Sequence, residues 1–354
     1  MTGRRTRTAA VAAAPPGSGG AGQNDVDRGL VARHHATVGR SRLVGRIAVA
    51  AYHLASSVLG HLPRQVTFWI LATLTQSTYL FWPQKRRFAN LNFGYVLGLP
   101  PDDPKVRRLA LAAHRHYAVY LAELMRLPRL NLDDAARMVE LQGVETLEAL
   151  RRDSGSVILV AAHIGNNELI AAGVASRNWR MNVLGDDSAL PELFEFLSSQ
   201  RARLGVRIIP WRSLREVYSV LKRGEMLGLL VDWGYRSDGV PVRLFDEWTT
   251  LPSGPAVLAA RSHAAILPVA ARRRPDGTFL VTHDTPIYVT SSEPAEISRA
   301  TQAIADALAR TIAAAPEQWY GFKPLWPATA DEVAEMARRV ATMGAVAQTG
   351  GADG

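Results

Sequence analysis

Two polar residues directly end apolar runs that have the composition of buried strands. His163 closes the run from Ser156 to Ala162, and Asp232 closes the run from Leu227 to Val231. Because the carboxyl ends of parallel strands meet at one rim of a sheet, we expect both side chains at the same rim if the two strands are parallel. Glu168 follows His163 by five residues, where a glycine-containing turn enters a predicted helix. One rim would then hold an imidazole and two carboxylates.

An imidazole beside a carboxylate is the arrangement that transfer of an acyl group to an alcohol requires. The reaction needs a base for the hydroxyl proton, a carboxylate that orients the base, and hydrogen-bond donors for the oxyanion. His163 is the candidate general base, since an imidazole with a pKa near ~6.5 is largely neutral at physiological pH and still accepts a proton. Residue types alone leave open whether Glu168 or Asp232 orients the ring, and a lone histidine at a strand end is more often structural.

The surrounding pattern predicts an α/β fold. Short runs rich in Val, Ile and Leu without alternation are typical of strands buried on both faces of a parallel sheet, and here they alternate with amphipathic stretches. We predict strands at 156–162, 181–185, 206–211, 227–232, 265–272 and 278–289. We predict helices at 104–127, at 132–152 in two parts, and at 167–176, 191–204, 214–223 and 254–263. These elements would form a central, mostly parallel sheet flanked by helices, in a domain spanning residues 101–345.

The ends of the chain differ in composition from this domain. Residues 1–42 are rich in Ala, Gly, Arg and Pro without periodicity, which predicts a disordered cytoplasmic leader, and residues 346–354 are predicted to be a disordered tail. Residues 43–100 are predicted to hold amphipathic helices, because two apolar, aromatic stretches end in the basic cluster 85–87, a composition typical of an interfacial membrane anchor. Neither stretch is a convincing membrane span. A buried helical hairpin with a basic turn explains the same residues equally well.

The charge balance and the lack of cysteine limit the chemistry. A formal net charge of +9 favours anionic partners such as a phospholipid surface, nucleic acid or a phosphorylated cofactor. The absence of cysteine excludes an acyl-cysteine intermediate and thiolate metal ligands. The sequence has no H-E-x-x-H motif to support a metal hydrolase built from His163 with Glu168, His263 or His283, and no G-x-S-x-G elbow to support a serine hydrolase.

Several segments, in order along the chain, resemble one group of enzymes. The segment from Ala161 to Glu168 is similar to the His-x4-Asp/Glu signature of glycerolipid acyltransferases, and more specifically to that of bacterial lipid A lauroyl/myristoyl acyltransferases and phosphatidylinositol mannoside acyltransferases. Between roughly residues 43 and 327 the likeness continues through segments 81–91, 228–234, 251–256, 265–269 and 316–320. Several segments in a fixed order are far more specific than one motif.

The resemblance implies an O-acyltransferase with an N-terminal membrane-docking region. Its donor would be acyl-CoA or acyl carrier protein, and its acceptor a hydroxyl of a membrane glycolipid or phospholipid, such as a phosphatidylinositol mannoside or a lipid A precursor. It would act at an anionic surface on the cytoplasmic face of the inner or plasma membrane, as a peripheral or monotopic protein. No cofactor, metal or nucleic acid is expected, since the thioester is a co-substrate. The alternative is a non-catalytic lipid-binding protein of the membrane surface, which the same positive charge and aromatic residues would serve.

The resemblance also implies roles for individual residues. His163 would be the base, and Asp232 and Glu168 are both catalytic candidates: Asp232 would orient the ring while Glu168 shapes the turn, although which acid orients the imidazole stays open. The candidate substrate-binding residues are Asn166, Asn167, Arg243, Ser253 and Gly254, and the segment 246–254 would line the acyl tunnel. Related lipid A enzymes carry an arginine after the next strand, where this chain has Gly185, Asp186 and Asp187, so Arg243 or Arg212 would have to supply the positive charge.

Overall fold

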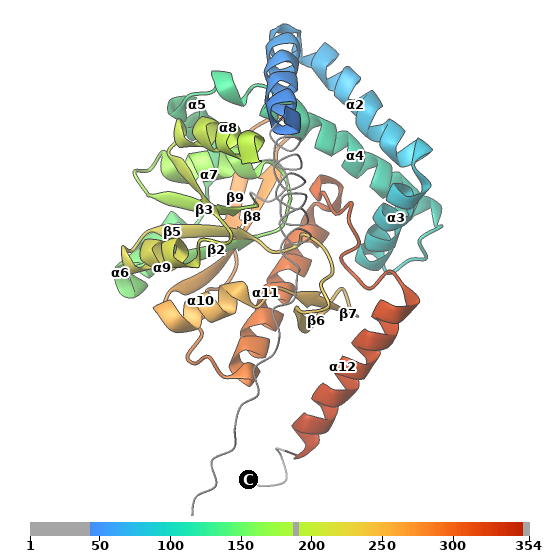
Figure 1. The fold of residues 1–354 in the computed structure, drawn as a ribbon, viewed down its shortest axis with the longest axis vertical. Helices are drawn as coiled ribbons and strands as arrows, with labels where there is room; N and C mark the ends of the chain where they lie inside the picture. The colour runs from blue at the N-terminus through green and yellow to red at the C-terminus, as the bar shows by residue number, and fades with distance from the viewer. Residues whose placement is uncertain (1–42, 187–190, 350–354) are drawn as a thin grey trace, which may run out of the picture.

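A seven-stranded sheet forms the centre of the molecule (Figure 1). The computed structural model describes residues 43–186 and 191–349, so the predicted leader lies outside the described residues. The strand order is β1-β9-β8-β2-β5-β3-β4. Only β8 and β9 pair antiparallel, whereas the other neighbouring strands pair in parallel. The strands are β1 (Val139–Leu141), β2 (Val157–Ala161), β3 (Met181–Gly185), β4 (Val206–Pro210), β5 (Met226–Leu230), β8 (Ala265–Arg273) and β9 (Phe279–His283). The predicted fold class, a mostly parallel sheet flanked by helices, is confirmed.

Alternate residues of β2 enter two different hydrophobic clusters, one on each face of the sheet. Val157 and Leu159 belong to a cluster shared with α6 and α7, and Ile158 and Val160 to a cluster shared with α9, α10 and α11. A strand buried on both faces needs no polar side chains, and this explains the unbroken apolar run. The flanking helices are α5 (Leu132–Met138), α6 (Val144–Ser154), α7 (Asn167–Ala175), α8 (Pro191–Ala202), α9 (Leu214–Lys222), α10 (Gly254–Ser262) and α11 (Pro294–Ala314).

Several elements differ from the sequence prediction. The short strand β1 separates the two helices predicted at 132–152, and the last predicted strand stops at His283. The sequence analysis did not predict the hairpin formed by β6 (Val240–Leu244) and β7 (Glu247–Leu251). It also did not predict the helices α11 and α12 (Ala330–Thr349). α12 runs through residues 346–349, the first part of the predicted tail, and residues 350–354 lie outside the described residues. In Figure 1, α12 extends away from the sheet.

The N-terminal part forms a layer of helices beside the sheet. A helix from Leu43 to His61 precedes α2 (Arg64–Phe81), α3 (Pro83–Leu97) and α4 (Pro104–Leu124). One face of α2 packs on α4, where Leu71 and Ala72 are buried and the Thr75 hydroxyl donates a 2.9 Å hydrogen bond to the carbonyl of His114.

The opposite face of this helical layer exposes large apolar side chains. Trp69 and Phe81 of α2 are 65% and 82% exposed. The Leu43–His61 helix is mostly exposed as well, and it is long and apolar enough to cross a membrane by length and composition, which the sequence prediction did not anticipate. One face of α2 is thus packed against α4, and the outer surface of the helical layer could dock to a membrane.

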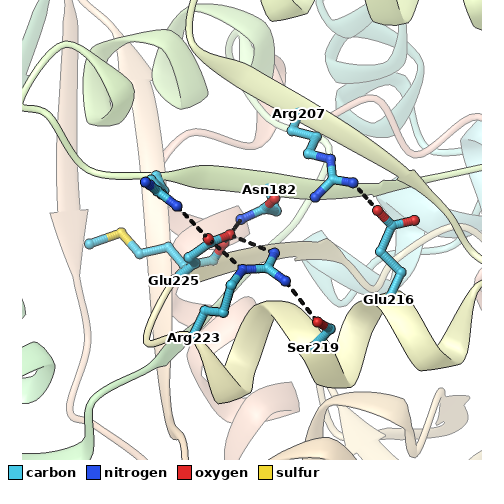
Figure 2. Close-up of polar contacts among 8 residues, drawn as sticks. Asn182, Arg207, Glu216, Ser219, Arg223 and Glu225 are labelled. Carbon is cyan, nitrogen blue, oxygen red and sulfur yellow. Dashed lines mark hydrogen bonds and ion pairs between the residues drawn. The ribbon is translucent and has the colours of Figure 1, made fainter.

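A network of ion pairs joins the amino ends of β3 and β5 (Figure 2). Glu225, which precedes β5 and is 7% exposed, accepts hydrogen bonds from Arg180, Asn182 and Arg223. The Arg223 hydrogen bond is the largest cause that lowers the pKa of Glu225, to about 2, and it outweighs the opposing effect of burial. The carboxylate thus ties the turn after α9 to β3, at the edge of the sheet opposite His163.

Replacing Glu225 with Gln is expected to lower the free energy of unfolding by about 1–2 kcal/mol at pH 7, because the charged hydrogen bonds are lost at a site whose arginines are partly exposed. A lowered folded pKa stabilises the fold above the ordinary value of 4.5 and loses this contribution as the pH falls toward 2. Urea unfolding curves should therefore differ at pH 7 and converge near pH 2. Glu216→Gln, which breaks the more exposed pair with Arg207 in Figure 2, is the control, with an expected effect below about 1 kcal/mol. Equal effects of the two substitutions would contradict the role of Glu225.

Candidate active site

The turn between β2 and α7 carries His163 and is held in place by a distant segment. Gly165 has a φ of +67°, and a Cβ there would lie 2.8 Å from the carbonyl oxygen of Ala271, so a glycine is needed. The amide of Tyr320 donates to the His163 carbonyl at 2.8 Å, and the amide of Gly165 donates to the Gln318 carbonyl at 3.1 Å. The segment around the short helix η2 (Pro316–Gln318) therefore fixes the backbone of the histidine.

Asp232 binds the imidazole of His163. β2 and β5 are parallel neighbours with Ala161 opposite Leu230, which confirms the expectation that both residues lie at one rim. The Nδ1 atom of His163 lies 2.7 Å from Oδ1 of Asp232, and the backbone amide of His163 donates to Oδ2 at 2.9 Å. The indole of Trp319 donates to the same Oδ2 at 2.8 Å. Because three donors surround this buried carboxylate, its orientation is fixed.

The charges of this pair stabilise one another. Burial raises the pKa of Asp232, but the charge and hydrogen bonds of His163 and the hydrogen bond of Trp319 outweigh it, so the net pKa is lowered. Burial lowers the pKa of His163, and the charge and hydrogen bond of Asp232 outweigh it, so the net pKa is raised above 6.5. An ionised carboxylate only accepts hydrogen bonds, so Nδ1 carries the proton in the neutral ring and Nε2 keeps a lone pair.

Glu168 does not contact the imidazole. Its carboxylate is paired with Arg201 of α8, whose Nε donates at 2.6 Å and whose terminal nitrogen makes a second bond. This two-point pair joins the first turn of α7 to α8. Of the two acids that the sequence left open, the structure brings Asp232 to His163 and commits Glu168 to a helix–helix contact.

A cleft of about 830 Å³ opens at His163. Its walls come from α2, α3, α4, α7 and α8, from β3, β4 and the end of β5, and from the segment 320–323. Most of the lining is apolar or aromatic, including Tyr117, Tyr120, Phe194, Trp233 and Phe322. In residues 43–186 and 191–349, no group of three or more His, Asp or Glu side chains is arranged to hold a metal ion. The cleft thus combines one acid–base pair with a large apolar surface.

Comparison with known proteins assigns the chain to a family. The model of the bacterial lipid A biosynthesis acyltransferase family matches residues 39–327, which is most of the chain. The protein belongs to this family. A phosphatidylinositol mannoside acyltransferase of Mycobacterium tuberculosis is 30% identical over 251 residues, covering 68% of this chain and 77% of the relative. A phosphatidylinositol mannoside acyltransferase of Mycolicibacterium smegmatis is 27% identical over 242 residues, covering 66% and 77%.

The other predicted site residues of this acyltransferase are divided between the cleft and the rest of the fold. Asn167 lines the cleft. Asn166 is buried, caps α7 by accepting from the amide of Leu169, and donates to Glu123 at 2.7 Å. It therefore shapes the turn.

The remaining candidates lie away from the cleft. Arg243 lies on the β6–β7 hairpin, where its side chain donates to the carbonyl of Asp246, and Ser253 and Gly254 begin α10. None of the three lines the cleft around His163, and the hairpin that carries 246–251 packs on α11 instead. Arg212 contacts the ring of Trp211 and is also outside the lining.

The structure adds residues around His163 of the acyltransferase that sequence reasoning missed. Trp319 binds Asp232, and Trp233 places its ring 5.3 Å from the imidazole of His163. The same Trp233 ring also contacts Lys323, whose Nζ lies 3.5 Å from the ring centroid. Trp233 follows Asp232 directly, and Trp319 stands in the segment 316–320 that carried part of the resemblance, so both positions were visible, although nothing in the sequence showed their contacts.

A second, smaller cavity adjoins the cleft. It has a volume of about 90 Å³ and lies between α7, α6 and the sheet, lined mainly by apolar side chains of β2, β5 and β8. Four residues line both cavities: Asn167, Ala171, Val183 and Leu230. The apolar lining thus continues from the acid–base pair into the space beneath α7.

Proposed function

We propose that this acyltransferase moves a fatty acyl group from a thioester, acyl-CoA or acyl carrier protein, onto a hydroxyl of a phosphatidylinositol mannoside or a closely related membrane glycolipid. The observation that carries the proposal is the His163–Asp232 pair at the floor of a cleft whose wall includes α2, the helix with the exposed apolar face. The acceptor class is taken from the names of the mycobacterial relatives.

His163 acts as the general base in this proposal. Its Nε2 lone pair takes the proton of the acceptor hydroxyl while the oxygen attacks the thioester carbonyl. The tetrahedral intermediate then expels the thiolate, breaking the C–S bond, and the imidazolium returns its proton to the sulfur. Asp232 holds the tautomer and stabilises the imidazolium. Backbone amides of the first turn of α7, which a helix leaves without intrahelical acceptors, are the candidate donors for the oxyanion.

The cleft at His163 is the proposed site of the acyl chain. Its volume of about 830 Å³ and its mostly apolar and aromatic lining suit a hydrocarbon chain, whereas the cavity beneath α7, at about 90 Å³, is too small for a palmitoyl chain. This location replaces segment 246–254 as the proposed tunnel wall, since residues 246–254 line neither cavity.

The exposed face of the N-terminal helices is the proposed membrane contact, on the cytoplasmic side. Replacing both Trp69 and Phe81 with Glu is expected to weaken binding to vesicles of phosphatidylglycerol and phosphatidylcholine by about tenfold or more, because each side chain loses its apolar burial in the interface. Flotation with vesicles measures the bound fraction. Val333→Glu changes another exposed apolar residue, on α12, and should leave binding unchanged. If the double variant floats like the wild type, this face is not the docking surface.

The proposed reaction has a direct test. Purified protein incubated with palmitoyl-CoA and phosphatidylinositol mannoside should release free CoA and form an acceptor that is heavier by one acyl chain, as seen by mass spectrometry. Release of CoA without the acylated lipid would indicate a thioesterase, and binding of the lipid without release of CoA would indicate the non-catalytic lipid-binding alternative. The lipid profile of a deletion strain then identifies the acceptor, because one species should lose one acyl chain.

A further inference from the structure

Two of the four lysines in this arginine-rich chain line the cleft. The 41 basic residues comprise 37 arginines and four lysines, and two of the four, Lys85 and Lys323, line the cleft around His163. Each ammonium is held near a tryptophan: Lys323 Nζ lies 3.5 Å from the ring centroid of Trp233, and Lys85 Nζ lies 5.8 Å from that of Trp82. The cation–π contacts orient both ammonium groups over tryptophan rings.

Among the residues that the structure describes, no ion pair neutralises the two ammonium groups. Of the other charged groups that line the cleft, Arg201 is paired with Glu168 and Asp232 with His163. Neither lysine forms an ion pair within the described part of the chain. Burial lowers the pKa of Lys323, Lys85 lowers it further, and Asp186, the remaining acidic group of the lining, raises it by less. Both ammonium groups line the same cleft and repel one another, so an anion bound in this cleft would relieve the repulsion.

We propose that Lys85 and Lys323 bind a phosphate ester carried by a substrate. This inference rests on the proposed function, in which both the lipid acceptor and a CoA donor carry such a group. Lysine binds phosphate as a compact point charge with three donors, and two lysines on opposite sides can share one phosphate. The pair would fix the substrate relative to the base, since Trp233, the ring under Lys323, also lies 5.3 Å from the imidazole of His163.

The position of Lys85 favours the phosphodiester of the lipid acceptor. Lys85 lies in the first turn of α3, directly after the exposed residues Phe81 and Trp82 at the end of α2. A docked membrane places lipid phosphates at the level of such interfacial aromatic residues. A lipid could then enter the cleft beside α2 with its phosphate between the lysines and its head group near His163.

The test compares Lys323→Met and Lys85→Met with Lys222→Met, which removes the same charge from an exposed site on α9 outside the cleft. Initial rates are measured against phosphatidylinositol mannoside at saturating palmitoyl-CoA, and against palmitoyl-CoA or S-palmitoyl-pantetheine, which lacks phosphate, at saturating acceptor. We expect each cleft variant to raise one KM about tenfold, as for loss of a charged hydrogen bond, with kcat changed less than about threefold. Lys323→Arg, which keeps the charge, should recover most of the loss.

The two series of rate measurements, with varied acceptor and with varied donor, distinguish the source of the phosphate. A raised KM for the lipid alone supports the acceptor phosphodiester, and a raised KM for palmitoyl-CoA but not for S-palmitoyl-pantetheine supports the donor phosphates. If both KM values in the cleft variants equal those of Lys222→Met, the inference is overturned while the proposed function stands.

If the wild type transfers no acyl group, the proposed function fails, and the phosphate site is then tested by binding alone. Equilibrium dialysis with CoA and with dihexanoyl phosphatidylinositol then compares the wild type with the Lys323→Met and Lys222→Met variants. Binding of either probe that is at least fivefold weaker only in Lys323→Met supports the phosphate site, and equal or absent binding overturns it.

Discussion

Replacing His163 with Ala is expected to reduce kcat for acyl transfer by about 10²–10⁴-fold, the usual contribution of a positioned general base. The acceptor hydroxyl would then have no side chain to take its proton. The fold should persist, because the backbone amide of residue 163 still donates to Asp232 and Trp319 still binds the same carboxylate. Transfer of a radiolabelled acyl chain to phosphatidylinositol mannoside, measured at several enzyme concentrations, gives the rates.

His263→Asn is the matched control for this substitution. His263 is an exposed histidine with a φ of +58° at the end of α10, a conformation that asparagine tolerates. The control should keep wild-type activity. Activity of His163→Ala within a few-fold of the control would show that the imidazole is not the base, and the pair with Asp232 would then be structural.

Replacing Asp232 with Asn is the second large effect, with an expected loss of about 10²–10⁴-fold in kcat. The amide of Asn can donate to Nδ1, which would leave the proton on Nε2 and remove the lone pair that faces the substrate. In the proposed mechanism the neutral ring is the active form, so wild-type activity should fall as the pH drops through the raised pKa of His163. Without the negative charge that pKa is lower, so the acidic limb of the pH profile should move to lower pH in the variant.

Trp319→Phe tests the fixed orientation of the Asp232 carboxylate separately from its negative charge. This variant removes one hydrogen bond to Oδ2 but keeps the carboxylate beside the ring. We expect a loss of about tenfold or less, with the acidic limb near the wild-type position. The measurement is the pH dependence of kcat/KM between pH 5 and 9, with circular dichroism of each variant to check the fold. An unchanged acidic limb in Asp232→Asn would mean that Asp232 does not set the pKa of His163.

The sheet and the place of the acid–base pair were predictable because they depend on local pattern. Buried parallel strands are short apolar runs, so β2, β3, β4, β5 and β8 were visible in the sequence within a few residues. The polar residues that end β2 and β5 meet because neighbouring parallel strands end at one rim. The hairpin β6–β7 escaped prediction, since Pro241 and the polar residues of β7 give no clear strand pattern.

Only the tertiary structure decides which of the two carboxylates, Glu168 or Asp232, contacts the imidazole of His163. Glu168 is nearer to His163 in sequence, yet the helix that follows directs its side chain to Arg201, 33 residues away. Asp232 is 69 residues from His163 in sequence and reaches the ring because β5 pairs with β2. Sequence separation carries no information about such contacts, because strand order decides them.

The sequence by itself determined the α/β class, the histidine at the end of a buried strand and, through ordered segments, the resemblance to acyltransferases. These features depend on residue type and on spacing along the chain. Only the tertiary structure decided that Asp232 holds the imidazole, that Trp319 fixes Asp232, that the apolar cavity lies beneath α7, and that Lys85 and Lys323 face one cleft. Each of these depends on segments far apart in the chain, which packing against a common sheet brings within a few ångströms.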